Sequence, residues 1–323
     1  MTASPAKNWL TKAWWKYTDP PQYQLYKERL AYYQSYQGLK KFESENRHTT
    51  MGEILGKLSG AAAINVSHTG NAGDVIYSLP VVRKLCEITG VPVNFLLKIN
   101  EPLRLMPGMS HPLGNVMLNM EMAESLISLL NFQSYIARAA IYSGQDVHLD
   151  LSAFRQSGLE LDRGNIARWY FYVTGINADL SEPWLGAEAR SEFSDAIIIA
   201  RSNRYNNPLV DYSFLSGYSN LVFVGIRAEY ERMKRSIENL YWHPVTNFLE
   251  LAQVIKGGKL FIGNQSFPFS VAEGLKVLRI LEVYHRIPNV IPEGRNGYDF
   301  YFQKHFEYLV DSLVSARDPE PAA

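Results

Sequence analysis

Four small or polar residues follow a short apolar run late in the chain, and their chemistry suits a phosphate group. Residues 260–262 predict a buried strand, and Gly263, Asn264, Gln265 and Ser266 predict a tight turn that leads into a helix. Unpaired backbone N–H groups and the positive end of the helix dipole at such a helix start attract a phosphate. Strand–turn–helix units occur in every parallel α/β domain, however, so this pattern is weak on its own.

A second unit of the same kind occupies residues 64–80, in the first half of the chain. Its loop contains Gly70, Asn71 and Gly73, and the two glycines would let a substrate approach the backbone closely. Asp74 follows in the first turn of the predicted helix, where the helix dipole favours the ionised carboxylate. Two such units, each opening its own α/β half, predict two domains that face one cleft.

Two roles fit the position of Asp74. An ionised carboxylate beside a substrate can act as a general base, and aspartate is also a common helix cap. The roles differ in magnitude, because losing a cap costs about 1 kcal/mol of stability, whereas losing a general base costs about 10²–10⁴ in rate. The sequence leaves both interpretations open.

Basic and hydroxyl side chains come directly after another apolar run, residues 196–200. Arg201, Ser202 and Arg204 lie there, at the end of the first predicted strand of the second half. Guanidinium groups and a hydroxyl suit a diphosphate, whereas the alternative is two solvated arginines on a loop.

Two acids also lie at predicted strand ends. Glu229 follows the apolar run 221–224 and could accept hydrogen bonds from a ribose or a base, or could simply be an acid in the first turn of a helix. Glu282 lies near the end of the predicted strand 279–283, a position that favours contact with a ligand.

Strands that alternate with helices predict α/β domains with parallel sheets, whose sites lie at the carboxyl ends of the strands. We expect a helical N-terminal extension at residues 1–59, two Rossmann-like domains at 60–180 and 190–300, and a C-terminal helix at 301–323 that packs back across both domains. Tyrosines recur at helical spacing in the extension, which predicts a packed face or, alternatively, a stacking surface for sugars or bases.

The composition of the chain argues against several classes of protein. The 323 residues suffice for two cores, and 32 basic residues balance 32 acidic ones, which argues against nucleic acid as a partner. The single cysteine, Cys86, excludes a disulfide framework, and the seven histidines lack metal-binding spacing, so no metal site is predicted. The chain lacks an apolar run that could span a bilayer and a signal-peptide region. We therefore expect a cytoplasmic protein with at most peripheral membrane contact through its aromatic and basic N-terminus.

Three motifs in this order resemble the lipopolysaccharide heptosyltransferases, which are nucleotide-sugar transferases of the GT-B fold. The first is Gly73-Asp74-Val-Ile-Tyr-Ser-Leu-Pro80, and the second is the stretch 261–266 that leads into residues 272–275. A weaker third motif occupies residues 225–235. Together they span most of residues 60–285, and residues 1–58 match no part of the family.

The resemblance implies roles for individual residues. It makes Asp74 the catalytic base, places Glu229 on the nucleoside of the donor, and requires Arg201 or Arg204 to take the place of a diphosphate-binding lysine. The second motif departs from the family, because Gln265 stands for a carboxylate and Phe267 for a glycine.

The predicted function is inverting, metal-independent transfer of a sugar from a nucleotide diphosphate donor to a hydroxyl on a glycan or lipopolysaccharide-like acceptor, without a cofactor. The second domain would hold the donor, and the loop with Gly70, Asn71 and Gly73 would lie on the acceptor side. The departures in the second motif leave a catalytically altered relative that only binds a nucleotide or glycan as an alternative. A transferase acting on modified DNA bases is a further alternative, which the neutral net charge disfavours.

Overall fold

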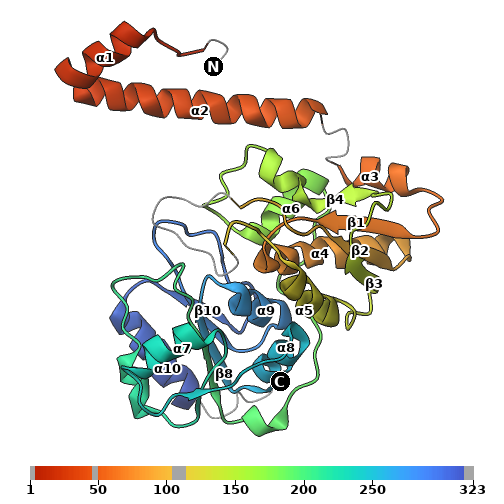
Figure 1. Cartoon of the computed structure of the whole chain (residues 1–323), viewed down its shortest axis with the longest axis vertical. Coiled ribbons are helices and arrows are strands. Elements are labelled where there is room, and N and C mark those ends of the chain that lie inside the picture. Colours follow the sequence, from red (N-terminus) through yellow and green to blue (C-terminus); the bar gives the residue numbers. More distant parts are fainter. Residues whose placement is uncertain (1–3, 46–49, 104–113, 316–323) are drawn as a thin grey trace.

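Two separate parallel β-sheets, each flanked by helices, and a helical hairpin at the N-terminus make up this protein (Figure 1). The structure is a computed structural model that describes residues 4–45, 50–103 and 114–315. The predicted fold class, two Rossmann-like α/β domains with a helical extension, is confirmed.

The first sheet has the strand order β3-β2-β1-β4. Its strands are β1 (Ile64–His68), β2 (Val93–Leu97), β3 (Ile136–Ile141) and β4 (Leu149–Asp150). The helices of this domain are α4 (Ala72–Thr89), α5 (Met120–Leu130) and α6 (Ile166–Thr174), together with the 3₁₀ helix η1 (Leu151–Gln156). Buried apolar side chains of β1 and β2 pack into the core of this domain, and β1 ends in two buried polar residues, Ser67 and His68.

The second sheet has the order β10-β9-β8-β5-β6-β7. Its strands are β5 (Ile197–Ala200), β6 (Leu221–Phe223), β7 (Tyr241–Trp242), β8 (Leu260–Asn264), β9 (Arg279–Glu282) and β10 (Gly297–Phe300). The helices are α7 (Arg227–Lys234), α8 (Phe248–Gly257), α9 (Phe267–Leu275) and α10 (Gln303–Ser315), with the 3₁₀ helices η2 (Ser191–Phe193) and η3 (Ser213–Gly217).

Both sheets have a point where the chain order reverses. From β7 to β10 the second sheet reads 3-2-1-4-5-6, the doubly wound order, and the reversal lies between β5 and β8. In the first sheet it lies between β1 and β4. Ligands of doubly wound folds bind at the carboxyl ends of the strands at such a point. The fold therefore predicts a ligand site next to the residues that follow His68, Ala200 and Asn264.

The two domains share a hydrophobic core. One cluster of buried side chains continues from the first sheet through the contacts of α4 with α9 and of α5 with α8 to one face of the second sheet. A second cluster lies on the other face of that sheet, under α10. Tight docking between α4 and α9 brings the starts of these two helices together.

The β8 strand is longer than the sequence predicts. Gly263 and Asn264 were expected in a turn, but they pair with Leu281 and Glu282 of β9 and complete the strand. A Cβ on Gly263 would lie 2.9 Å from the carbonyl oxygen of Ala200, so a larger residue would push β5 and β8 apart. The turn is therefore confined to Gln265 and Ser266.

The described part of the C-terminal helix packs on one domain only. Phe306, Leu309 and Val310 of α10 belong to the second core, and the Phe306 ring stacks on that of Phe300 at 4.1 Å between centroids. The buried side chains of α10 over residues 303–315 face the second sheet. Residues 316–323 lie outside the described part, so the packing of residues 301–323 across both domains stays a prediction.

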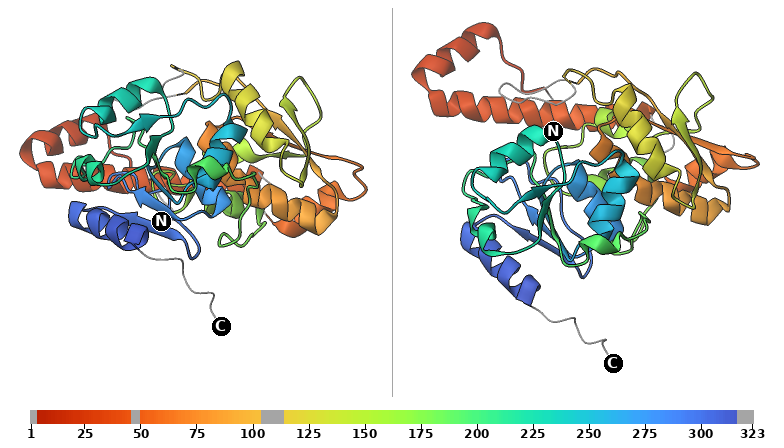
Figure 2. Two further views of the ribbon diagram at one scale, coloured as in Figure 1. Left: turned by 90° about the horizontal axis from the view of Figure 1, so that it is seen from below. Right: turned by 60° about the horizontal axis from the view of Figure 1, so that its bottom comes forward.

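The N-terminal extension is helical, as predicted. It contains α1 (Trp9–Thr18), α2 (Pro20–Glu45) and α3 (Met51–Leu58), and Figure 2 shows the α1–α2 hairpin from two further sides. The tyrosine stripe packs in part on the extension itself, since Tyr26 lies against Trp15 with 5.8 Å between ring centroids. No helix in the described ranges has the length and apolar character needed to cross a membrane.

Candidate active site at the domain junction

Asp74 has two partners at the start of α4. Its Oδ2 atom accepts a hydrogen bond from the backbone N–H of Asn71 (3.1 Å), which closes a capping box. The same oxygen forms an ion pair with Arg155 of η1. The carboxylate therefore caps the helix, and a guanidinium group balances its charge. Asp74 is only 8% exposed, so a substrate would have to reach it through a narrow opening.

Gly70 is required by packing, and the predicted approach of a substrate to this loop stays a prediction. A Cβ at this position would lie 2.5 Å from Cε1 of His68 and 2.9 Å from Oδ2 of Asp74. A side chain at position 70 would therefore displace the carboxylate. A Cβ at Gly73 would meet Ser270 Oγ of α9 at 3.9 Å, an ordinary contact that also shows how close the two helix starts lie.

A buried histidine supports Asp74 from behind. His68 Nδ1 accepts the backbone N–H of Gly70 (2.8 Å), so Nε2 carries the proton and donates to the Tyr170 hydroxyl (2.9 Å). That hydroxyl donates in turn to the backbone carbonyl of Asp74 (2.9 Å). Burial lowers the pKa of His68 to about 4, which keeps the ring neutral, and the N–H of Gly70 on Nδ1 fixes the tautomer.

Acid is expected to weaken the protein through His68. In the folded state its pKa is about 4, below the ordinary value of 6.5, so between these values only the unfolded chain takes up a proton. The contribution of His68 is complete above pH 6.5 and is lost as pH falls toward 4, by up to about 3 kcal/mol. Urea unfolding at steps across this range measures the loss. A His68→Gln protein should show a flatter profile, and a variant of the exposed His285, His285→Gln, should keep the wild-type slope.

The loop after β5 is held by a side chain of β8. Asn264 Oδ1 accepts the backbone N–H of Ser202 (3.0 Å), and its Nδ2 donates to the carbonyl of Ser202 (2.8 Å) and to the side chain of Asn206 (3.2 Å). Asn264 is fully buried. It therefore joins β5 to β8 at the reversal point and fixes the loop 201–207, with no donor or acceptor left for a ligand.

Arg201 and Glu282 bind each other. Two hydrogen bonds connect the guanidinium and the carboxylate, Nε to Oε2 at 2.7 Å and Nη2 to Oε1 at 2.8 Å. Glu282 is fully buried and also accepts the backbone N–H of Asn207 (2.6 Å). The Arg201 guanidinium lies over the Tyr212 ring at 4.5 Å. Both residues were predicted to bind the donor, but the structure uses them to support the loop.

Arg204 has no ion pair within the described ranges. Its Nη2 donates to the hydroxyl of Tyr205 (3.0 Å), its guanidinium lies 5.0 Å from that ring, and its Nε is buried without a partner. Ser202 Oγ accepts the backbone N–H of Arg204 at 3.4 Å. Of the arginines predicted for a diphosphate, Arg204 is therefore the one whose charge is available.

Glu229 lies beneath the same loop. One carboxylate oxygen accepts the backbone N–H of Asn203 (3.0 Å), and burial raises the pKa of this acid. The other oxygen faces Gly225, where a Cβ would come within 3.5 Å. The position is compatible with the predicted contact to a nucleoside, although the first partner of Glu229 is the loop itself.

Gln265 connects the two domains. Its Nε2 donates to the carbonyl of Ile287 (2.7 Å) and to Asn289 Oδ1 (2.8 Å), and its Oε1 accepts the N–H of Tyr284 (2.6 Å). Asn289 in turn donates to the carbonyl of Leu161 in the first domain (3.0 Å). A carboxylate cannot donate these bonds. These hydrogen bonds therefore require an amide at position 265. Both N–H groups of the side chain are used within the protein, so neither is left to bind a nucleotide sugar.

The start of α9 offers fewer N–H groups than a typical helix start. Pro268 has no N–H, and the N–H of Phe269 already bonds to the carbonyl of Ser266 (3.1 Å). The Ser266 hydroxyl donates to the carbonyl of Asn264 (3.3 Å), so the phosphate site predicted here is reduced to the N–H of Phe267 and the dipole. The Phe267 ring packs on Phe248 of α8, with 4.1 Å between centroids.

Arg155 keeps its charge beside Asp74. Burial lowers its pKa, but the Asp74 carboxylate, Tyr170 and Tyr205 together raise it, so the net pKa is raised.

The start of α4 lies beside that of α9, because a Cβ on Gly73 would come within 3.9 Å of Ser270 Oγ. Asn264, at the end of the strand that leads into α9, holds the loop 201–207. We call the α4 start, η1, this loop and the α9 start the domain junction.

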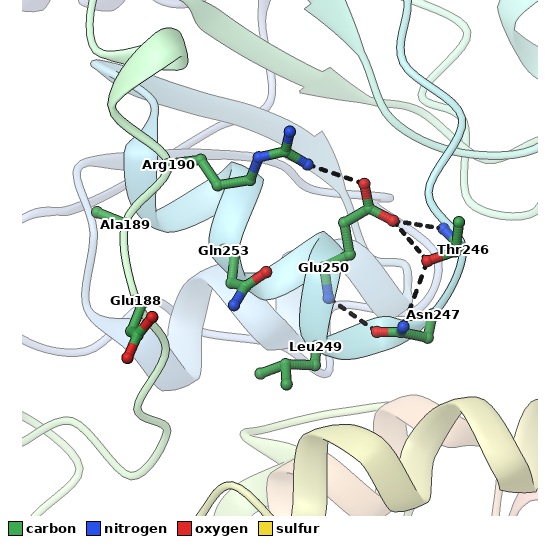
Figure 3. Close-up of a pocket in the computed structure, with 8 residues that line it drawn as sticks. All are labelled: Glu188, Ala189, Arg190, Thr246, Asn247, Leu249, Glu250 and Gln253. Atoms are coloured by element: carbon green, nitrogen blue, oxygen red, sulfur yellow. Dashed lines mark hydrogen bonds and ion pairs between the residues drawn. The ribbon is translucent and has the colours of Figure 1, made fainter.

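A surface hollow of about 500 Å³ lies elsewhere, between residues 188–190 and the start of α8. Figure 3 shows that several of its polar groups bond to one another, with Arg190 paired to Glu250 at 2.8 Å and Glu250 bonded to Thr246. It contains none of the predicted site residues. Within the described ranges, no three His, Cys, Asp or Glu side chains come together as metal ligands would.

Comparison with known proteins gives the fold a name. No protein-family profile and no curated protein sequence matches the chain. A glycosyl transferase of family 9 from Veillonella parvula matches in structure with a TM-score of 0.51 and 13% identity, over 80% of this chain and 90% of the other. The E. coli heptosyltransferase WaaC with ADP-2-deoxy-2-fluoro heptose gives a TM-score of 0.52 and 9% identity, over 77% of this chain and 99% of WaaC.

This chain has the GT-B fold. The family resemblance drawn from the three motifs is confirmed as a structural match to heptosyltransferases of glycosyltransferase family 9. With identities this low, the match establishes the arrangement of the domains and not the chemistry. The chemistry has to be argued from the residues of the GT-B domain junction.

Sequence reasoning missed several residues of this junction. Arg155, His68 and Tyr170 are essential to the surroundings of Asp74, but Arg155 and Tyr170 lie 81 and 96 residues from it in sequence. Only the His68 position carried a signal, because a polar residue ended an apolar run just before the glycine loop. Asn207 was also missed, since its importance lies in a backbone N–H.

Proposed function

We propose that this protein is an inverting glycosyltransferase that moves a sugar from a nucleotide diphosphate donor to a hydroxyl acceptor. The observation that carries the proposal is the position of Asp74, a carboxylate at the start of α4, where this helix meets α9 of the second domain in a GT-B fold. The solved relative WaaC was determined with an ADP-sugar analogue, so an ADP-sugar is the first donor to test.

In the proposed mechanism Asp74 removes the proton of the acceptor hydroxyl. The hydroxyl oxygen then attacks the anomeric carbon from the face opposite the diphosphate, which leaves with both electrons of the glycosidic C–O bond. Arg155 pairs with Asp74 and restricts this base in the absence of substrate. An acceptor must share or displace Arg155, and an anionic group on the acceptor would do so most readily.

The diphosphate is assigned to the second wall of the junction. Arg204 supplies a cation without an acidic partner in the described ranges. The Ser202 hydroxyl and the backbone N–H of Phe267 at the α9 start supply hydrogen-bond donors. Charge stabilisation of a leaving group is usually the largest single catalytic effect. In this proposal the loop 201–207 and the segment 284–289 are held in place by Arg201, Glu282, Asn264 and Gln265.

Arg204→Ala is expected to weaken donor use. Loss of a charged hydrogen bond of about 1.5–3 kcal/mol corresponds to roughly tenfold to hundredfold in kcat/KM. The assay incubates the protein with ADP-, UDP- and GDP-sugars, with and without glycan acceptors, and measures release of nucleoside diphosphate. Arg227→Ala, which removes an exposed arginine paired with Glu231, is the matched control and should retain wild-type kinetics. Equal kinetics for both variants would contradict the role of Arg204.

A second candidate, binding without turnover, is supported by the side chain of Gln265. The amide forms its hydrogen bonds with the segment 284–289, which leaves neither of its N–H groups for a nucleotide sugar. The same donor panel separates the two functions. Binding heat in calorimetry with no nucleotide release from any donor would favour the binding protein, and acceptor-dependent release would favour the transferase.

A further inference from the structure

The first helix exposes an aromatic face that no part of residues 4–45, 50–103 or 114–315 covers. No residue of α1 is buried, and Trp9, Trp14 and Tyr17 are 73%, 67% and 80% exposed. Leu10 is 59% exposed. At 3.6 residues per turn these four side chains fall within an arc of about 140°. A contiguous group of this kind marks an interaction surface and not scattered surface apolar residues.

The same segment is strongly basic in a chain that is neutral as a whole. Residues 4–18 contain Lys7, Lys12 and Lys16 and no acid, whereas the complete chain has equal numbers of acidic and basic residues. Lys12 and Lys16 lie one turn apart at one edge of the aromatic arc. The ammonium of Lys16 lies 5.8 Å from the centre of the Tyr17 ring. The helix therefore offers apolar rings flanked by positive charge.

The hairpin presents this face away from both sheets. Trp15, on the opposite side of α1, packs on Tyr26 of α2, and α1 lies at the outer end of the hairpin in each view (Figures 1 and 2). The other half of α2 is attached to the first domain. Ser35 Oγ donates to the carbonyl of Gly158 (3.3 Å), and a Cβ at Gly158 would lie 2.9 Å from the backbone nitrogen of Leu39. The helix α2 thus holds α1 out from the domains.

The aromatic and lysine side chains of α1 favour a lipid surface as the partner. Tryptophan and tyrosine place their rings at the boundary between lipid headgroups and acyl chains, and lysine stems extend from there to anionic headgroups. A protein interface fits less well, because lysine is depleted in such interfaces. A second copy fits poorly too, since a two-fold contact through α1 would bring the lysines of both chains together.

We infer that α1 is an interfacial helix that lays its Trp9–Leu10–Trp14–Tyr17 face on an anionic lipid bilayer. Binding requires the rings to enter the headgroup region and the lysines to meet negative lipids. The helix lies in the plane of the surface and does not span it. This inference is independent of the proposed catalytic function, because lipid binding is measured without turnover.

The test is flotation of the full-length protein with vesicles of phosphatidylcholine alone or mixed in equal parts with phosphatidylglycerol. We expect binding to the mixed vesicles, weakened by high salt. Trp14→Ser with Tyr17→Ser, and separately Lys12→Glu with Lys16→Glu, should each lower the partition coefficient by about tenfold or more. These side chains are exposed, so the variants should fold, which circular dichroism checks.

Matched controls come from the second domain. Tyr308→Ser removes an aromatic ring that is 66% exposed on α10, and Lys256→Glu with Lys304→Glu reverses two exposed lysines. Both control proteins should float like the wild type. The inference is overturned if wild-type protein ignores the mixed vesicles or if the α1 variants float like the controls. It is also overturned if the α1 variants convert a wild-type dimer to a monomer without any lipid binding, because a second copy would then cover the face.

Discussion

Replacing Asp74 by asparagine is expected to lower the rate of sugar transfer by about 10²–10⁴-fold while the protein stays folded. Asparagine keeps a side-chain oxygen that can accept the N–H of Asn71, so most of the helix cap survives. It cannot take a proton from an acceptor hydroxyl, and it leaves Arg155 without its counter-charge. The measurement is nucleoside diphosphate release with donor and acceptor, together with urea unfolding.

Asp150→Asn is the matched control for this experiment. Asp150 also caps a helix, by accepting the N–H of Ser152 (2.9 Å), and it also has an ion pair, with Lys98 at 2.8 Å. It lies in the same domain, at the end of β4, but has no place in the proposed mechanism. Its variant should transfer sugar at a rate near that of the wild type. A folded Asp74→Asn protein with an unchanged rate, or an equal loss in both variants, would remove Asp74 as the base.

The Glu282→Gln variant is expected to lose about 3 kcal/mol of unfolding free energy or somewhat more. The Glu282 carboxylate is fully buried, and its removal leaves the charge of Arg201, whose side chain is only 17% exposed, without a partner. The N–H of Asn207 would also depend on a weaker acceptor. Urea unfolding measures the loss of stability, and donor titration shows whether the loop 201–207 still binds.

Two further proteins sharpen this test. Glu231→Gln makes the same chemical change in an exposed pair with Arg227 and should cost about 0–1 kcal/mol. Removing both charges, with Glu282→Gln and Arg201→Met together, should regain part of the stability, because no unpaired charge stays buried. If Glu282→Gln instead keeps full stability and abolishes donor binding, Glu282 contacts the ligand as the sequence predicts.

The identity of the elements could be read from sequence because it depends on local patterns. Apolar runs such as 197–200 and 260–262 are long enough to mark buried parallel strands, and their alternation with helices fixes the fold class. Asp74 was recognisable for a similar reason, since a helix start after a glycine loop is a local feature. Pro268 shows that local chemistry can also be overlooked, because its missing N–H was already visible in the sequence.

The partners of each charged side chain were decided only by the tertiary structure. Arg201 and Arg204 are equivalent in sequence, but the end of β9 brings Glu282 to Arg201 and leaves Arg204 without an acid in the described ranges. Arg155 reaches Asp74 from 81 residues away because β4 and η1 return the chain to the edge of β1. A sequence determines which residues can ionise, whereas the packing of distant strands determines which charges are neutralised and which stay available to a substrate.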